Sequence, residues 1–194
     1  MKNLILSMTI IFTITACKSE VKKTMDTPTE SSTSEVNKEI KEETRTLFIN
    51  LTPKNDSGVI AKAKFEQTSG VVLMTVSARG LSEGTHAIHI HEKSDCSSED
   101  GKSAGGHWNP TAKPHGKWGS EKGYHKGDIG NFEVISSDED TIIEFKSDEW
   151  CIGCGDPNKD ILGKGVIVHQ GKDDFTSQPS GAAGSRISCG GIIE

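Results

Sequence analysis

Six of the seven histidines in this chain lie between His86 and His125, and this concentration constrains the fold more than any other feature of the sequence. Imidazole is a ligand that copper and zinc share. The segment 86–128 begins with alternating apolar residues and continues through a stretch rich in Gly, Pro and Lys. So many imidazoles in one segment indicate a fold that holds more than one metal ion.

The first part of this segment predicts a strand. His89 and His91 alternate with Ile88 and Ile90, and residues two apart on a strand point to the same face. We therefore expect these two imidazoles to reach one metal ion together. On a regular strand, a residue three positions from His89 faces the other way, so we interpret His86 as structural.

The second part predicts a metal-binding loop. His107, His115, His125 and Asp128 lie in a sequence too irregular for helix or strand, and three imidazoles with one carboxylate can close a tetrahedral zinc site. Either half alone has a simpler explanation, as a histidine pair with no ligand role or as a loop that buffers metals without specificity. Together with His169, which ends a later apolar run, the two halves favour specific metal sites.

The rest of the chain predicts an all-β fold. Eight short apolar or alternating segments with turn signals between them indicate an antiparallel sandwich or barrel. They cover residues 47–51, 59–67, 71–78, 86–92, 131–136, 141–145, 165–169 and 186–193. The connection 93–130 is long, which is acceptable for a functional loop that metal would organise.

The N-terminus, residues 1–17, has the pattern of a secretory signal. Lys2 precedes the apolar run Leu4–Ile14, and the small residue Ala16 precedes Cys17. The sequence Ile-Thr-Ala-Cys ending at Cys17 resembles a bacterial lipobox, which implies cleavage before this cysteine and lipid attached to it. The alternatives are an ordinary signal with a chance cysteine, or an uncleaved membrane span, for which the apolar run is short.

Residues 18–44 are rich in Lys, Glu, Ser and Thr and have no apolar period, so we expect a disordered tether. The folded domain is predicted at 45–194. The formal charge of the chain is −6, which disfavours nucleic acid as a partner. An anionic substrate would need a locally positive site.

Five motifs between residues 45 and 193 make the chain resemble the Cu/Zn superoxide dismutase family, and their order and spacing both fit. They are His89-x-His91-Glu92, Gly106-His107-Trp-Asn-Pro, His125-x-Gly-Asp128, Val168-His169 and Gly184-Ser-Arg186-Ile-Ser-Cys189-Gly. The resemblance implies an eight-stranded antiparallel Greek-key barrel or sandwich with long metal-binding and electrostatic loops.

The resemblance also implies two metal sites. Copper would be bound by His89, His91, His107 and His169, and zinc by His107, His115, His125 and Asp128. One imidazole, that of His107, would bridge the two ions. Asp173 resembles the carboxylate that links a copper histidine to a zinc histidine.

The implied activity is dismutation of superoxide to dioxygen and hydrogen peroxide. Arg186 would sit beside the copper and attract the anion, and His107 would carry a proton. Ala87 and Ile88 depart from the Gly and Phe that the family often has, and the short segment 175–183 is closer to bacterial forms. Two alternatives are a non-enzymatic copper/zinc-binding or copper-storage protein on the same fold, and an adhesion-type sandwich with incidental histidines.

Lipid on Cys17 would leave four cysteines, in an exported protein where disulfides persist. By resemblance, Cys96 pairs with Cys189. Cys151 and Cys154 form a C-x-x-C motif that the family does not usually have. A local disulfide is the favoured reading, because a redox motif needs a thioredoxin-like setting and a second zinc site needs two further ligands. We expect lipid anchoring at the periplasmic or outer surface of a bacterial membrane, and a homodimer is possible.

Overall fold

The computed structural model describes residues 44–194. The predicted signal, the lipid site Cys17 and all of the predicted tether except Thr44 lie outside the described residues. Among the residues that are described, no helix is long and apolar enough to cross a membrane.

All eight predicted strands are confirmed, with ends that differ by a few residues. The strands are β1 Arg45–Pro53, β2 Ile60–Thr68, β3 Val71–Arg79, β4 Gly84–His91, β5 Gly130–Val134, β6 Thr141–Ser147, β7 Gly165–His169 and β8 Arg186–Gly191. A single 3-10 turn, η1 Lys102–Ala104, interrupts the long β4–β5 connection.

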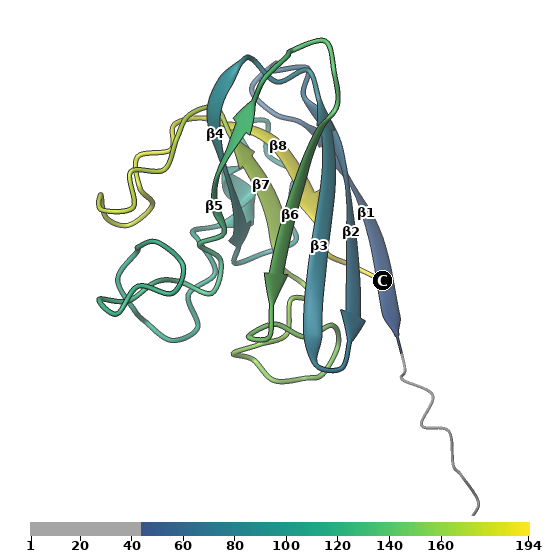
Figure 1. Cartoon of the computed structure of the whole chain (residues 1–194), viewed down its shortest axis with the longest axis vertical. Coiled ribbons are helices and arrows are strands. Elements are labelled where there is room, and N and C mark those ends of the chain that lie inside the picture. The colour runs from purple at the N-terminus through teal and green to yellow at the C-terminus, as the bar shows by residue number, and fades with distance from the viewer. Residues whose placement is uncertain (1–43) are drawn as a thin grey trace, which may run out of the picture. The chain divides into compact units, whose positions relative to one another are not determined.

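The strands form one antiparallel sheet in the order β5-β4-β7-β8-β1-β2-β3-β6. The sheet curls into a nearly closed barrel with β5 and β6 at its two edges (Figure 1). Because β3 pairs with β6 and β4 pairs with β7, the chain leaves one half of the sheet after β3 and returns to it at β6, as in a Greek key. The predicted all-β fold is therefore confirmed.

One wall of the barrel shows the alternation expected of a sheet with one solvated face. Every second residue is buried along β3, and along β2 as far as Phe65. Phe65 and Met74 are directly opposite each other across these strands and are fully buried. Lys62 and Lys64, on the alternate positions of β2, face away from the core.

The other wall is buried on both faces. The last six residues of β4 and all five of β7 are buried. Ile88 and Ile90 belong to the barrel core, so His89 and His91 lie on the outer face. Figure 1 shows the β4–β5 and β7–β8 connections projecting on the same side of the barrel. Long loops therefore cover this wall and shield the histidines from water.

A glycine lets the long loop approach β4 closely. The Ile90 N–H donates to the Gly127 carbonyl at 3.0 Å, and the Trp108 N–H donates to the Ile90 carbonyl at 2.8 Å. A Cβ at position 127 would lie 2.0 Å from the Ile90 oxygen, so only glycine fits here. These contacts bring His107 and Asp128, the neighbours of Trp108 and Gly127, against the strand that carries His89.

Candidate metal centre

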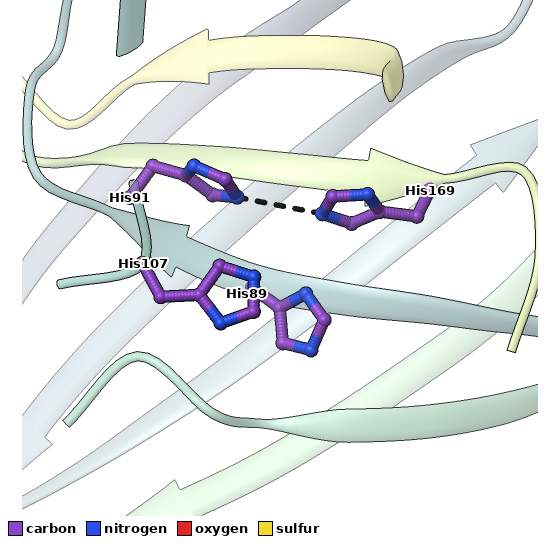
Figure 2. Close-up of side chains that lie close together, drawn as sticks. All are labelled: His89, His91, His107 and His169. Carbon is purple, nitrogen blue, oxygen red and sulfur yellow. Dashed lines mark hydrogen bonds between the residues drawn. The ribbon is translucent and has the colours of Figure 1, made fainter. Parts of the chain in front are cut away.

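Four buried imidazoles converge at the outer face of β4 and β7. Figure 2 shows His89 and His91 from β4, His169 from the end of β7, and His107 from the loop. One ring nitrogen from each residue lies within 4.8 Å of the others, and His91 Nε2 is 3.4 Å from His169 Nε2. The two strands place these residues together because His89 and Ile167 are cross-strand partners.

A second cluster adjoins the first and shares His107 with it. It comprises His107, His115, His125 and Asp128, all buried, again with ligand atoms within 4.8 Å of one another. The Asp128 carboxylate is 2.8 Å from His107 Nδ1, 3.0 Å from His115 Nδ1 and 3.2 Å from His125 Nδ1. The sequence prediction of two adjoining groups with one common histidine matches this geometry.

The unpaired nitrogens in the two clusters fit metal binding. Five buried ring nitrogens make no hydrogen bond of regular geometry within residues 44–194, although two of them, on His115 and His125, lie close to Asp128. They are His89 Nδ1, His107 Nε2, His115 Nδ1, His125 Nδ1 and His169 Nδ1. A buried polar atom without a partner typically costs about 1–3 kcal/mol, and such atoms are rare unless an ion or water satisfies them. Four imidazoles suit copper, and three imidazoles with a carboxylate suit zinc.

Hydrogen bonds to the remaining ring nitrogens fix how the imidazoles are turned. His91 Nδ1–H donates to the Gly105 carbonyl at 3.0 Å. His89 Nε2–H and His115 Nε2–H each donate to one oxygen of Asp173, both at 2.9 Å. Asp173 thus links the two clusters, in the position that the family resemblance implied, and a carboxylate in this position orients its histidines.

Burial sets the protonation of the first cluster. Burial lowers the pKa of His89, His91 and His169, and it lowers the pKa of His107 to about 4 despite the hydrogen bond with Asp128. A histidine must be neutral to bind a metal. These four imidazoles are therefore neutral, with lone pairs available, at physiological pH.

The second cluster is governed by its carboxylates. Burial would lower the pKa of His115, but hydrogen bonds with Asp128 and Asp173 raise it to about 9. Burial opposes ionisation of Asp128, yet the three imidazoles close to its carboxylate hold its pKa well below the usual range. At neutral pH the cluster therefore holds a proton on His115 beside the ionised Asp128, and a divalent cation would bind by displacing that proton.

Arg186 lies at the mouth of the first cluster. It opposes His169 across β7 and β8, next to a β-bulge at Val168. Its guanidinium donates to the carbonyls of Gly101 and Gly105, both at 2.7 Å. It lines a cleft of about 650 Å³ that His91, His107 and His169 also line. Partial burial lowers its pKa, but a guanidinium stays charged at neutral pH.

His86 lies outside both clusters, consistent with its interpretation as structural. It stacks on Phe132 with ring centroids 5.8 Å apart, and its Nδ1–H donates to the His169 carbonyl at 3.0 Å. Through that bond it fixes the backbone of a first-cluster histidine from the other side of the strand.

Both predicted disulfides form, Cys96–Cys189 across 93 residues and Cys151–Cys154 within one turn. Asp160 lies close enough to the second pair to make a third group of possible ligands. Its carboxylate, however, already accepts the N–H groups of Gly153, Gly155 and Leu162. The local disulfide expected from the C-x-x-C motif is therefore the arrangement observed.

Three residues that support the site were not predicted from the sequence. Gln178 accepts the His115 N–H and donates to the His115 carbonyl, each at 2.9 Å. Asn131 and Asp173 exchange hydrogen bonds in the same way, at 2.7 and 2.8 Å. Gly181 packs directly against Asp173. The signal available was the polar and glycine content of the two loops, which does not identify single residues.

Comparisons with known proteins agree with this site. A family model described as copper/zinc superoxide dismutase matches residues 59–192. The chain is 36% identical over 138 residues to "Superoxide dismutase [Cu-Zn] 2" of Aquifex aeolicus, covering 69% of this chain and 79% of the relative. It is 36% identical over 140 residues to an extracellular superoxide dismutase of Caenorhabditis elegans, covering 69% of this chain and 61% of that protein.

A solved structure is similar over the same region. The crystal structure of a double mutant of a SOD-like protein from Bacillus subtilis, in which two residues are replaced by histidine, superposes with a TM-score of 0.67. The two proteins are 31% identical, and the match covers 76% of this chain and 97% of the other.

Proposed function

Because this chain belongs to the copper/zinc superoxide dismutase family, we propose that it dismutates superoxide outside the cytoplasm. The family's metals are copper and zinc, and the two histidine clusters supply a donor set for each. Copper, when bound, supplies the one-electron chemistry that converts two superoxide anions and two protons into dioxygen and hydrogen peroxide.

The protein's own residues have separate roles in this proposal. His89, His91, His107 and His169 hold copper, and His107, His115, His125 and Asp128 hold zinc. Among the described residues, His107 Nε2 has no hydrogen-bond partner, and it can carry a proton when it is free of metal. Arg186 draws the anion into the cleft, because it carries a permanent charge and its guanidinium is held beside the first cluster by the carbonyls of Gly101 and Gly105.

The observation that carries the proposal is the shared histidine. His107 belongs to both clusters, with Nδ1 bonded to Asp128 and Nε2 unpaired. A storage protein on this fold needs a copper site but not a bridge to a second ion. The name of the Bacillus subtilis relative, SOD-like, makes a non-enzymatic copper-binding protein the second candidate.

Metal content and superoxide decay, measured on the full-length protein, test the proposal. His91→Ala is expected to lose copper and nearly all activity while zinc remains. Asp128→Ala is expected to lose zinc first, because Asp128 is itself a member of the second cluster and contacts all three of its histidines. Wild-type protein that binds both metals but does not accelerate superoxide decay would support the storage alternative.

The same proposal includes a lipid anchor at Cys17, which lies outside the described residues. It is supported by the secretory pattern and the lipobox-like residues, by two disulfides, and by an extracellular relative. Cys17→Ala is expected to abolish lipidation and shift the protein to the aqueous phase in detergent partitioning. A variant that still enters the detergent phase would contradict the anchor.

A further inference from the structure

The C-x-x-C loop is the feature that the proposed chemistry does not use. It lies in the β6–β7 connection, residues 148–164 (Figure 1). Two residues of this connection, Glu149 and Trp150, precede Cys151 directly and contact the segment that carries His125. The loop therefore lies within reach of the zinc half of the site.

Glu149 and Trp150 contact Tyr124 and Lys126, the two residues that flank His125. Glu149 accepts a hydrogen bond from the Tyr124 hydroxyl at 2.5 Å and forms an ion pair with Lys126. The Trp150 indole N–H donates to the Lys126 carbonyl at 2.8 Å. Glu149 thus binds the side chains of both neighbours of His125, a proposed zinc ligand. Trp150 binds the backbone between His125 and Asp128.

Packing restricts the movement of the Trp150 side chain. Its side chain is 1% exposed, and it packs against Phe145 and Trp118 with ring centroids 5.1 and 5.9 Å away. Phe145 belongs to β6, so the indole is anchored to the barrel as well as to the zinc loop. A buried indole held on two sides has little freedom to change the position of the carbonyl it binds.

The disulfide fixes the chain that follows Trp150. The Cys151 N–H donates to the Lys159 carbonyl at 2.8 Å, and the Cys151 carbonyl accepts the Ile161 N–H at 3.0 Å. Arg45 donates to the Ile152 carbonyl at 2.7 Å. With Cys154 bonded to Cys151, the turn is closed and tied to β1. The disulfide and these hydrogen bonds therefore hold the loop, and with it Glu149 and Trp150, in one conformation.

We propose that Glu149 and Trp150, held by the Cys151–Cys154 disulfide, are positioning residues of the zinc site. They set the conformation of residues 124–128, from which His125 and Asp128 reach the metal. The inference rests on the proposed function, because it assumes zinc at the second cluster. Partners that orient metal ligands typically change metal affinity by ~10- to 100-fold when they are removed.

The other disulfide provides a matched comparison. Cys96 and Cys189 pack with Ala104 and Ile167 on the copper side. Ala104 lies between the two glycines whose carbonyls accept from Arg186. Each disulfide therefore borders a different half of the site. Loss of the Cys151–Cys154 disulfide should therefore change the geometry of the zinc site. Loss of the Cys96–Cys189 disulfide should instead change the position of Arg186.

The test is zinc affinity in the full-length protein, measured by chelator competition, together with the visible spectrum of Co²⁺ bound in place of zinc. Cys151→Ser/Cys154→Ser is expected to raise the zinc dissociation constant ~10-fold or more and to change the Co²⁺ bands. Trp150→Phe, which keeps an aromatic ring but removes the indole N–H and part of the buried volume, and Glu149→Gln should shift both readouts in the same direction by less. Cys96→Ser/Cys189→Ser should leave the Co²⁺ bands unchanged.

Two outcomes distinguish failure of the proposed function from failure of the positioning role. If the wild-type protein binds no zinc or Co²⁺ through His115, His125 and Asp128, the proposed function itself is wrong. If the wild type binds zinc but Trp150→Phe and Glu149→Gln keep its affinity and Co²⁺ spectrum, the positioning role is overturned. These single variants decide the question even where the double cysteine variant fails to fold.

Discussion

At the scale of single residues, the mouth of the site depends on Arg186. The chain carries a formal charge of −6, so its average field repels an anion such as superoxide. At about 0.15 M salt the Debye length is about 8 Å, so distant acidic residues are mostly screened while a charge lining the cleft is not. The hydrogen bonds to Gly101 and Gly105 hold this guanidinium in place.

Reversing this charge is expected to slow catalysis. Arg186→Glu should lower the rate constant for superoxide decay at least ~10-fold, because the local field changes sign, while copper and zinc contents stay unchanged. The wild-type rate should fall as salt is added, and the variant's rate should rise or stay flat. The measurement is decay of pulse-generated superoxide at several salt concentrations. A fully metallated variant with the wild-type rate and salt slope would show that Arg186 does not guide the anion.

At the scale of elements, the β7–β8 loop places one carboxylate between two metal clusters. Gly181 adopts φ +66°, and a Cβ there would lie 1.8 Å from Asp173 Oδ1 and 2.6 Å from His115 Nε2. The backbone of the loop must therefore pass this close for Asp173 to reach both His115 and His89. A larger residue would push the loop or the carboxylate away.

Gly181→Ala is accordingly expected to weaken zinc binding ~10-fold or more, as removal of an orienting partner does. Asp173→Asn, which keeps the side-chain volume but removes the charge, should also lower the affinity for zinc. Chelator competition measures both. The matched control is Gly163→Ala, at a positive-φ glycine with open space around its Cβ, which should carry only the backbone strain. Equal zinc affinity in the Gly181 and Gly163 variants would contradict the close-packing argument.

The elements also show how far the sequence could lead. Alternation, apolar runs and turn signals together predicted all eight strands. Inward and outward positions differ along β2 and β3, whereas β7 is an apolar run that is buried throughout. It could not predict that β8 pairs with β1, since non-local pairing depends on the whole core. Spacing alone placed His89 and His91 together, but Asp173 was identified only by resemblance. The contacts of Trp150 with Lys126 were not predictable, because the two are joined by tertiary packing alone.

At the scale of the whole molecule, the site links stability to pH. Within the described domain, four histidines of the first cluster have lowered pKa values because they are buried, and that of His107 falls to about 4. Such groups favour the folded state above the ordinary histidine pKa of about 6.5 and lose that contribution as pH falls toward the folded value. His115, with its pKa raised to about 9 by Asp128 and Asp173 against burial, behaves in the opposite way.

The metal-free protein is therefore expected to be most stable near pH 6.5. Below it, the folded state binds fewer protons than the unfolded chain, and the lowering of the His107 pKa from 6.5 to about 4 corresponds to ~3 kcal/mol. Above it, the stabilisation from protonated His115 is lost as pH rises through about 9. Bound zinc replaces that proton, so the loss at alkaline pH should disappear in the zinc-loaded protein. Thermal unfolding between pH 4 and pH 10, with and without zinc, measures the loss of stability on the acid side and on the alkaline side of pH 6.5. If the alkaline limb has the same slope in the two forms, zinc does not displace the His115 proton, and the assignment of this histidine as a zinc ligand is wrong.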